Sequence, residues 1–312
     1  MQKGNGRSAF VTGGAGFIGS HVVETLVRDG WHVSVVDDLS GGDRANLPVG
    51  VPLVVCDIAD PALMQVFVDG EFDAVIHCAA QTSVPHSVAD PAFDRQVNLV
   101  GTENVVRCAK ATGVGRFAFF SSGGAVYGDT TIRADETTLP APLSPYGVHK
   151  LAAEGYVTLS GLSYAILRPA NVYGPRQRAG TDGGVIATFV DRLSHGETLH
   201  VNGDGEQVRD FVYVADVAAA VRSALAWDCS GIWNVASGAE TTVNDLARYV
   251  GQALGIVPTV AYGPARAGDV RISRLSNERI IQQGGWRPEY TLARGLAVMV
   301  ATKVDADMTV AD

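Results

Sequence analysis

Apolar runs and helical patterns alternate along the first half of the chain. Continuous apolar segments of strand length occur at Ser8–Thr12, Val33–Val36, Leu53–Cys56, Ala74–Cys78, Arg116–Ser121 and Ala165–Arg168. Amphipathic segments of helical length lie at Gly19–Arg28, Pro61–Val68, Phe93–Thr112 and Tyr146–Leu159. Apolar strands that alternate with helices are typical of a parallel sheet covered on both faces. The pattern therefore predicts a doubly wound α/β domain of the Rossmann type.

After Asn171 the regular alternation of apolar strands and amphipathic helices ends. Tyr173–Gly184 is rich in Gly, Pro and Arg, which predicts a loop over a site. We expect helices at Val185–Ser194, Asp216–Trp227, Val243–Leu254 and Thr291–Lys303, strands at Val208–Val214 and Ile232–Val235, and a frayed polar tail at Val304–Asp312. Residues 1–171 plus about 207–236 are thus expected to form the first domain. Residues 172–206 plus 237–312 are expected to form a smaller, mixed α/β C-terminal lobe.

Composition narrows the class of protein. The 312 residues are 46% apolar and 18% charged, enough to bury a sizeable core. The longest apolar runs are too short to cross a bilayer, so we expect no contact with a membrane. Met1–Ser8 lacks the apolar segment of a secretion signal, which makes a cytoplasmic location the default expectation. The net charge of −9 argues against nucleic acid as a partner.

Cysteine and histidine spacing gives no support for metal or redox chemistry. The four cysteines form no CxxC pair, and the seven histidines form no HExxH pair. We therefore expect no metal site.

The first apolar strand runs into a glycine-rich turn, Thr12-Gly13-Gly14-Ala15-Gly16-Phe17-Ile18-Gly19. In this GxxGxxG spacing, Gly13 allows a tight turn, Gly16 lets the backbone approach a pyrophosphate, and Gly19 permits close packing of helix on strand. The free N–H groups at the start of the following helix face the phosphates. The motif predicts a dinucleotide site.

Acidic residues at the ends of the next two strands refine this prediction. Asp37 follows the second strand, 18 residues after Gly19, where a carboxylate would accept both hydroxyls of the adenosine ribose and repel a 2′-phosphate. This favours NAD over NADP, and the alternative for Asp37 is a solvated loop acid. Asp57 and Ile58 close the third strand and are placed to meet the adenine; the alternative for Asp57 is a turn residue.

Tyr146 and Lys150 form a Tyr-x-x-x-Lys pair at the start of a predicted helix. The i, i+4 spacing puts both side chains on one helix face. The ordinary tyrosine pKa of about 10 is too high for a base at neutral pH. A nearby ammonium and a positively charged nicotinamide would favour the phenolate, which can then accept a proton from a substrate hydroxyl. The alternative is an ordinary surface pair.

With these two motifs, the sequence resembles the extended short-chain dehydrogenase/reductases, and within them the UDP-glucose 4-epimerase group. The resemblance extends through Val75–Ala80, Val97–Thr102, Ser121–Gly128, Leu167–Pro175, Val208–Asp216, Arg266–Asp269 and Gly285–Pro288. It implies NAD as the cofactor. The residues implied to contact it are Gly13, Gly16, Phe17, Ile18, Gly19, Asp37, Asp38, Ser40, Asp57, Ile58, Cys78, Ala79, Ala80, Thr82, Asn98, Ser121, Tyr146, Lys150 and Ala170.

One position departs from the epimerase pattern. Aligned on Tyr127-Gly128, Gly123 stands where the family usually has a catalytic serine or threonine. Ser122, a water or a substrate hydroxyl must substitute, or Tyr146 works alone; of these we favour Ser122, whose alternative is a strand-end hydroxyl bonded to backbone. Related dehydratases and decarboxylases carry acidic residues where this chain has Gly123-Gly124-Ala125. The absence of an acid at these three positions argues against a reaction that eliminates water.

The resemblance also implies a nucleotide-diphosphate sugar, UDP- or dTDP-linked, as substrate. Arg209 and Arg266 would hold the diphosphate, Asp269 the ribose and Asn171 a phosphate or sugar oxygen, with Val185 and Ser273 lining the site. For Arg209 the alternative is a structural ion pair with Asp210 or Asp216. Arg176 and Arg178 in the preceding loop could help to hold the diphosphate; the alternative for them, which we favour, is solvated loop charge. The small Ser273 stands where some family members have a bulky aromatic residue, which leaves room for an N-acetyl group. UDP-GlcNAc/UDP-GalNAc is therefore a candidate substrate beside UDP-Glc/UDP-Gal, and UDP-glucuronate is a further candidate.

The reaction implied is inversion at C4 through a transient 4-keto sugar, with no net redox change. The alternatives are a nucleotide-sugar reductase, dehydrogenase or dehydratase of the same family, and a non-catalytic dinucleotide-sensing protein, in which the Tyr/Lys pair is often lost. The helices Phe93–Thr112 and Tyr146–Leu159 resemble those of a four-helix dimer interface, so a homodimer is expected, although their apolar stripes could equally face the core.

Overall fold

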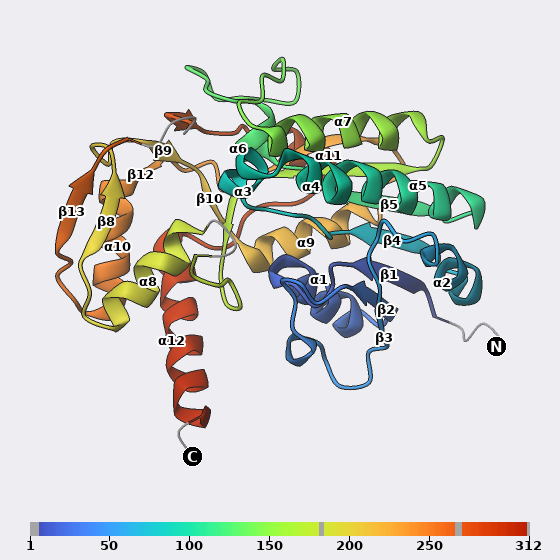
Figure 1. Cartoon of the computed structure of the whole chain (residues 1–312), viewed down its shortest axis with the longest axis horizontal. Coiled ribbons are helices and arrows are strands. Elements are labelled where there is room, and N and C mark those ends of the chain that lie inside the picture. Colours follow the sequence, from blue (N-terminus) through green and yellow to red (C-terminus); the bar gives the residue numbers. More distant parts are fainter. Residues whose placement is uncertain (1–5, 181–183, 266–269, 311–312) are drawn as a thin grey trace.

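A seven-stranded parallel sheet forms the centre of the molecule (Figure 1). The computed structural model describes residues 6–180, 184–265 and 270–310. The strands are β1 Ser8–Thr12, β2 His32–Asp37, β3 Leu53–Val55, β4 Ala74–His77, β5 Arg116–Phe120, β6 Tyr164–Pro169 and β11 Gly231–Val235, in the order β11-β6-β5-β4-β1-β2-β3. The predicted parallel Rossmann sheet is confirmed, with the Ile232–Val235 segment as its seventh strand.

Helices cover both faces of this sheet because successive strand residues point to opposite sides. Val11, Ile76 and Ala118 pack under α1 (Phe17–Arg28) and α9 (Val214–Ala224). Their neighbours Phe10, Val75 and Phe117 pack against the other face. That face carries α2 Leu63–Gly70, α5 Thr102–Ala111 and α7 Pro145–Leu159. Figure 1 shows α5 and α7 on the side of the sheet opposite α1 and α9.

The predicted helix Phe93–Thr112 is composite. It consists of α4 (Pro91–Arg95), a π-helical turn at Gln96–Gly101 and α5. A Cβ on Gly101 would lie 2.6 Å from the Ile58 side chain, so a glycine is needed at this crossing. Wide π-turns of this kind often occur at functional sites, and this one contains the buried Asn98.

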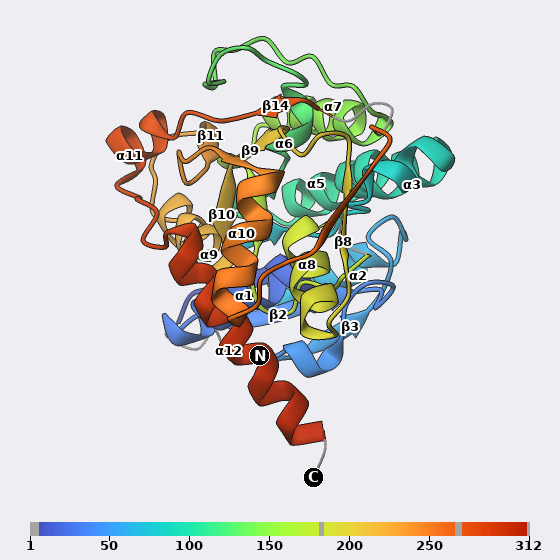
Figure 2. The same cartoon turned by 90° about the vertical axis from the view of Figure 1, so that its left-hand side faces the viewer.

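Smaller sheets and three longer helices lie beside the main sheet (Figure 2). The helices are α8 Val185–Ser194, α10 Val243–Leu254 and α12 Leu292–Val310. The strand groups are β7 Asn171–Tyr173 with β10 Phe211–Tyr213, β8 Leu199–Asn202 with β13 Val260–Gly263, and β9 Val208–Arg209 between β12 Thr241–Thr242 and β14 Ile272–Ser273. Short helices occur at α3 Val84–Ala89, η1 Arg44–Asn46, α6 Gly123–Val126 and α11 Glu278–Gly284. A separate apolar cluster, including Phe189, Phe211 and Leu246, forms the core of this part.

Two sequence predictions are wrong. Val208–Val214 is not one strand, because Asp210 separates β9 from β10 and turns its buried carboxylate toward the Ser237 and Gly238 backbone N–H groups. The predicted tail from Val304 instead continues α12 to Val310, and Ala311 and Asp312 lie outside the described residues. Within the described residues, no helix is both long and apolar enough to cross a membrane.

Candidate active site

The glycine-rich turn between β1 and α1 has the close packing that its spacing predicts. Gly13 adopts a φ of +64°, and a Cβ there would lie 2.6 Å from the Ala79 backbone. A Cβ on Gly19 would lie 2.1 Å from the Gly13 carbonyl oxygen. Gly16 ends the turn as the N-cap of α1 without a capping side chain, so the helix N-terminus is uncapped by protein side chains. The turn is therefore shaped to let a phosphate approach the backbone.

Asp37 lies at the carboxyl end of β2, beside this turn. Its carboxylate accepts from the Ala15 N–H (3.0 Å) and the Leu39 N–H (2.9 Å) and is 6% exposed. Burial raises its pKa, and these two hydrogen bonds act in the opposite direction. The alternative of a solvated loop acid is wrong for Asp37. Asp57, by contrast, is exposed and accepts from the Ala59 N–H, the geometry of a turn residue.

The other residues expected at the cofactor also gather at the carboxyl edge of the sheet. Phe17 and Ile18 begin α1, Asp38 and Ser40 follow β2, Ile58 follows β3, Cys78, Ala79, Ala80 and Thr82 follow β4, Ser121 follows β5, and Ala170 follows β6. Open α/β sheets bind ligands outside this edge. These residues thus stand at or shortly after the carboxyl ends of the strands, the edge at which the glycine turn also lies.

A buried chain of hydrogen bonds, which sequence reasoning missed, connects this turn to the π-helical segment. Thr102 Oγ1 donates to the Asn98 carbonyl (2.8 Å), so it accepts from His77 Nε2 (2.9 Å). Thr12 Oγ1 accepts from the Ala79 N–H (3.2 Å) and donates to His77 Nδ1 (2.6 Å). Burial lowers the pKa of His77 to about 3, so this ring is neutral with its proton on Nε2. The His77-Cys78-Ala79-Ala80 run, which begins at the last residue of β4, is the sequence signal that could have pointed to it.

Asn98 supplies an independent test of whether a ligand fits here. Its Nδ2 donates to the Gln81 carbonyl (2.8 Å) and to Asp94 (3.0 Å), whereas its Oδ1 is buried with no partner among the described residues. A buried acceptor without a donor is costly unless a ligand or water supplies one. Together with the glycine turn, this orphan oxygen fits a dinucleotide carrying hydroxyl donors.

Tyr146 and Lys150 lie on the buried face of α7, as their spacing predicts. Burial raises the pKa of Tyr146 to about 12, while a side-chain hydrogen bond with Ser122 lowers it. Lys150 Nζ donates to the Phe120 carbonyl (2.8 Å), and burial lowers its pKa to about 8. Desolvation therefore favours the neutral phenol, and activation requires the positive charges of the predicted mechanism to outweigh this effect of burial. The hydroxyl of Ser122 is the one that pairs with it.

A buried ion pair fixes α7 to the sheet. Glu154, one turn after Lys150, accepts two hydrogen bonds from Arg168 of β6, at 2.8 and 2.5 Å. It also accepts from the Ser121 hydroxyl. Arg168 donates further to the Tyr127 hydroxyl (2.8 Å). Paired hydrogen bonds of this kind define orientation as well as distance, so the helix carrying Tyr146 is held rigidly.

The two glycines at the start of α6 face different surroundings. A Cβ on Gly123 would lie 2.4 Å from Leu275 Cδ1 and about 3 Å from the Arg168 and Pro169 carbonyl oxygens. A Cβ on Gly124 would lie 3.6 Å from Asn171 Oδ1 and 4.0 Å from Ser273 Oγ. Gly123 therefore points into the core, and Gly124 points toward residues expected to bind substrate.

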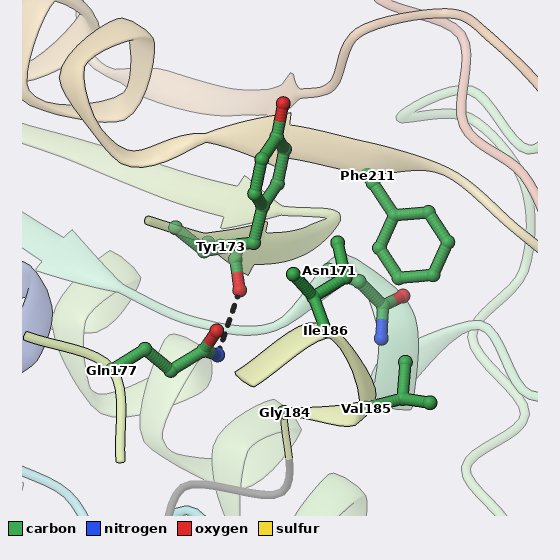
Figure 3. Close-up of a pocket in the computed structure, with 8 residues that line it drawn as sticks. Asn171, Tyr173, Gln177, Gly184, Val185, Ile186 and Phe211 are labelled. Carbon is green, nitrogen blue, oxygen red and sulfur yellow. Dashed lines mark hydrogen bonds between the residues drawn. The ribbon is translucent and has the colours of Figure 1, made fainter. Parts of the chain in front are cut away.

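Part of the expected substrate set lines one small cavity, shown in Figure 3. Asn171 and Val185 belong to it, together with Gln177, Gly184 and Phe211. Asn171 Oδ1 and Gln177 Oε1 are buried without a partner among the described residues. Gln177 Nε2 donates to the Val172 carbonyl (3.0 Å), and sequence reasoning did not single out this residue.

The structure places the remaining charged residues expected at the substrate in different surroundings. Arg209 pairs in register with Ser273 across β9 and β14, and its guanidinium donates to the Val208 carbonyl. Arg266 and Asp269 lie outside the described residues. Arg176 bonds to Glu24 and Ser20 of α1 and so is not solvated loop charge. No metal-binding cluster of His, Cys, Asp or Glu occurs among the residues described.

Comparisons with known proteins agree with this geometry. The model of the NAD dependent epimerase/dehydratase family matches residues 9–236. A UDP-glucose 4-epimerase of Mycolicibacterium smegmatis is 39% identical over 301 residues, covering 93% of this chain and 96% of that protein. The crystal structure of a UDP-glucose 4-epimerase from Thermotoga maritima with UDP-glucose has a TM-score of 0.92 at 40% identity, covering 96% of this chain and 99% of the other.

A second solved structure carries the cofactor. The UDP-glucose 4-epimerase of Thermus thermophilus in complex with NAD has a TM-score of 0.90 at 40% identity, covering 94% of this chain and 98% of the other. The predicted resemblance and the predicted NAD cofactor are confirmed by the family match. The chain belongs to the NAD-dependent epimerase/dehydratase family.

Proposed function

We propose that this protein is an NAD-dependent UDP-sugar 4-epimerase, acting on a hexose such as UDP-glucose or UDP-galactose. The observation that carries the proposal is the buried Tyr146 hydroxyl, which pairs with Ser122 beside the buried Lys150 at the edge where the glycine turn lies. The relatives named UDP-glucose 4-epimerase support it, because they match almost the whole chain.

The protein's own groups account for proton transfer. Tyr146 must first become a phenolate, which the positive charge of an oxidised nicotinamide would favour against the effect of burial. In that form it would accept the proton of the sugar C4 hydroxyl and later return it, with Ser122 relaying or steadying that proton. NAD, when bound, would supply the oxidised ring that can take up a hydride from C4 of the sugar and return it. We propose that Lys150, one helical turn after Tyr146, places its ammonium on the same face of α7 as the phenol and would hydrogen-bond the nicotinamide ribose.

The residues assigned to NAD fit the group. Gly13, Gly16 and Gly19 leave the α1 N-terminus open to the pyrophosphate. Asp37 lies where the ribose hydroxyls would reach its carboxylate, and Asn98 Oδ1 offers an unused acceptor. The same edge holds the other predicted contacts, which we propose line the cofactor.

The small residues of α6 favour inversion at C4 over elimination of water from the sugar. The positions of Gly123, Gly124 and Ala125 carry no acid that could protonate a departing hydroxyl. Gly124 instead leaves space beside Asn171 and Ser273. We propose that this space admits an N-acetyl group, so UDP-GlcNAc and UDP-GalNAc are candidates beside UDP-glucose, UDP-galactose and UDP-glucuronate.

We propose that the diphosphate is held by Arg209 with Arg266, the ribose by Asp269, and a phosphate or sugar oxygen by Asn171 near Val185. In this arrangement the substrate lies between the sheet domain, residues 1–171 plus about 207–236, and the lobe of residues 172–206 plus 237–312. Ser273, 6% exposed and in register with Arg209, links the two halves of the proposed substrate site.

We further propose a homodimer built on α7 and α5. Val148, Gly155, Tyr156 and Leu159 are exposed on one stripe of α7, at the i, i+7, i+8 and i+11 positions. An apolar stripe of this kind, with a glycine that permits close approach, is typical of helices that pack against a partner. A cytoplasmic location is also proposed, in keeping with four cysteines that form no disulfide.

Incubation of the purified protein with UDP-galactose, UDP-GalNAc and UDP-glucuronate, followed by NMR, tests the function. Inversion at C4 without net consumption of NAD supports it. Stoichiometric reduction, oxidation or dehydration of every substrate offered would refute it in favour of the related activities. Tyr146→Phe should lose about 10²- to 10⁴-fold in kcat with NAD still bound, whereas the control Tyr164→Phe, at the amino end of β6 and so at the edge of the sheet opposite the glycine turn, should not.

A further inference from the structure

Asp94 is a fully buried carboxylate that takes no part in the proposed proton transfer. Its Oδ2 accepts from His149 Nδ1 at 2.6 Å. Its Oδ1 accepts from Gln81 Nε2 at 2.6 Å and from Asn98 Nδ2 at 3.0 Å. A carboxylate removed from water is tolerated only when its oxygens are hydrogen-bonded, so these donors belong to the same built feature.

The first donor lies on the helix that carries the proposed base. His149 is three residues after Tyr146 and directly precedes Lys150 in α7. Its side chain is 14% exposed and faces α4 through Asp94. Because each helical residue turns by about 100°, a fixed ring at His149 also fixes the direction in which Tyr146 points.

The second donor lies in the segment between β4 and α3 that we assign to the cofactor. Gln81 stands between Ala80 and Thr82, and its carboxamide bonds to both the backbone N–H and the carbonyl of Ser83. The Gln81 carbonyl in turn accepts from Asn98 Nδ2 at 2.8 Å. The shape of this segment is therefore set by the same cluster that holds α7.

We propose that Asp94 and His149 are positioning residues that keep the cofactor segment and the catalytic helix in register, so that the phenol meets the reacting carbon. The proposal rests on the proposed function. Neither residue contacts the substrate, and each acts through a neighbour: His149 through α7, and Asp94 through Gln81 and Asn98. Loss of the link should loosen two segments that are far apart in the chain.

A matched pair of substitutions at His149 tests the link. His149→Phe removes the donor to Asp94 and keeps an aromatic ring; His149→Asn retains an amide nitrogen near the place of Nδ1. We expect kcat to fall about 10- to 100-fold in His149→Phe, since a misplacement of about 1 Å costs up to that much. KM for the UDP-sugar should stay within about twofold, NAD should dissociate several-fold faster, and His149→Asn should recover most of kcat. An unchanged kcat, or equal losses in both variants, would overturn the proposal.

Asp94→Asn gives a readout that a merely structural role would not move. Besides burial, the charge of Asp94 raises the pKa of Tyr146, so the acid limb of the kcat pH profile should shift to lower pH in this isosteric variant. A limb that stays in place counts against the proposal even if His149→Phe does not fold. Wild-type protein that inverts no UDP-sugar would refute the proposed function instead. In that case an unchanged NAD dissociation rate in His149→Phe would still refute this inference separately.

Discussion

Serine at position 123, one of the two residues that the family resemblance led us to expect there, should destabilise this protein and should not raise its kcat. Both Gly123 and Gly124 begin α6, so Gly→Ser gains about 0.5 kcal/mol of helix propensity at either. At Gly123 the new Cβ would lie 2.4 Å from Leu275 Cδ1 and about 3 Å from two backbone oxygens of β6. Overpacking of this kind costs about 1–3 kcal/mol. At Gly124 the nearest atoms are at 3.6 and 4.0 Å, ordinary contact distances.

The assay is thermal unfolding of Gly123→Ser and Gly124→Ser beside the wild type. An unfolding entropy of about 2.1 cal/mol/K per residue gives about 0.65 kcal/mol/K for 312 residues. Gly123→Ser should therefore melt about 2–5 °C below Gly124→Ser. Gly124→Ser should instead raise KM, because its hydroxyl enters the space beside Asn171. If Gly123→Ser were as stable as Gly124→Ser and faster than wild type, the assignment of that position to the core would be refuted.

Three further predictions concern single residues. Glu71 adopts a φ of +45° at the end of α2, so Glu71→Gly should stabilise the protein by roughly 0.5–1 kcal/mol in urea unfolding; a loss would contradict the backbone geometry. Burial raises the pKa of Asp210 from 3.8 to about 6, so the stability it contributes, about 3 kcal/mol, is complete below pH 4 and lost as the pH rises through about 6. Asp210→Asn should remove that pH dependence, and equal slopes in both proteins would disprove it. In ¹⁵N NMR, His77 should remain neutral with its proton on Nε2 down to pH 5, and titration near pH 6.5 would exclude the proposed chain of hydrogen bonds.

Local sequence was sufficient for the features that depend on near neighbours. The turn at Gly13, Gly16 and Gly19 could be predicted because its spacing encodes a backbone shape within eight residues. The Tyr146/Lys150 pair could be predicted because four residues make one helical turn. The strands of the main sheet could also be predicted from the sequence, since strands buried on both faces have continuous apolar runs.

The short strands in the second half of the chain could not be predicted from local sequence in this way. The break at Asp210 depends on Ser237 and Gly238, which lie more than 25 residues away and supply the N–H groups that make a buried carboxylate tolerable. The π-helical turn at Gln96–Gly101 is set by contact of Gly101 with Ile58, again a distant partner. Two-residue strands such as β12 carry no period that a pattern could show.

The sequence by itself determined the class of fold, the glycine-rich cofactor turn and the Tyr146/Lys150 pair. Each of these features depends on residues that lie close together in the chain. Only the tertiary structure decided that Gly123 faces the core, that Ser122 meets Tyr146, and that burial keeps the phenol protonated. The physical reason is that desolvation and steric space are set by atoms from distant segments. Their effect on the pKa of Tyr146 exceeds that of its sequence neighbours.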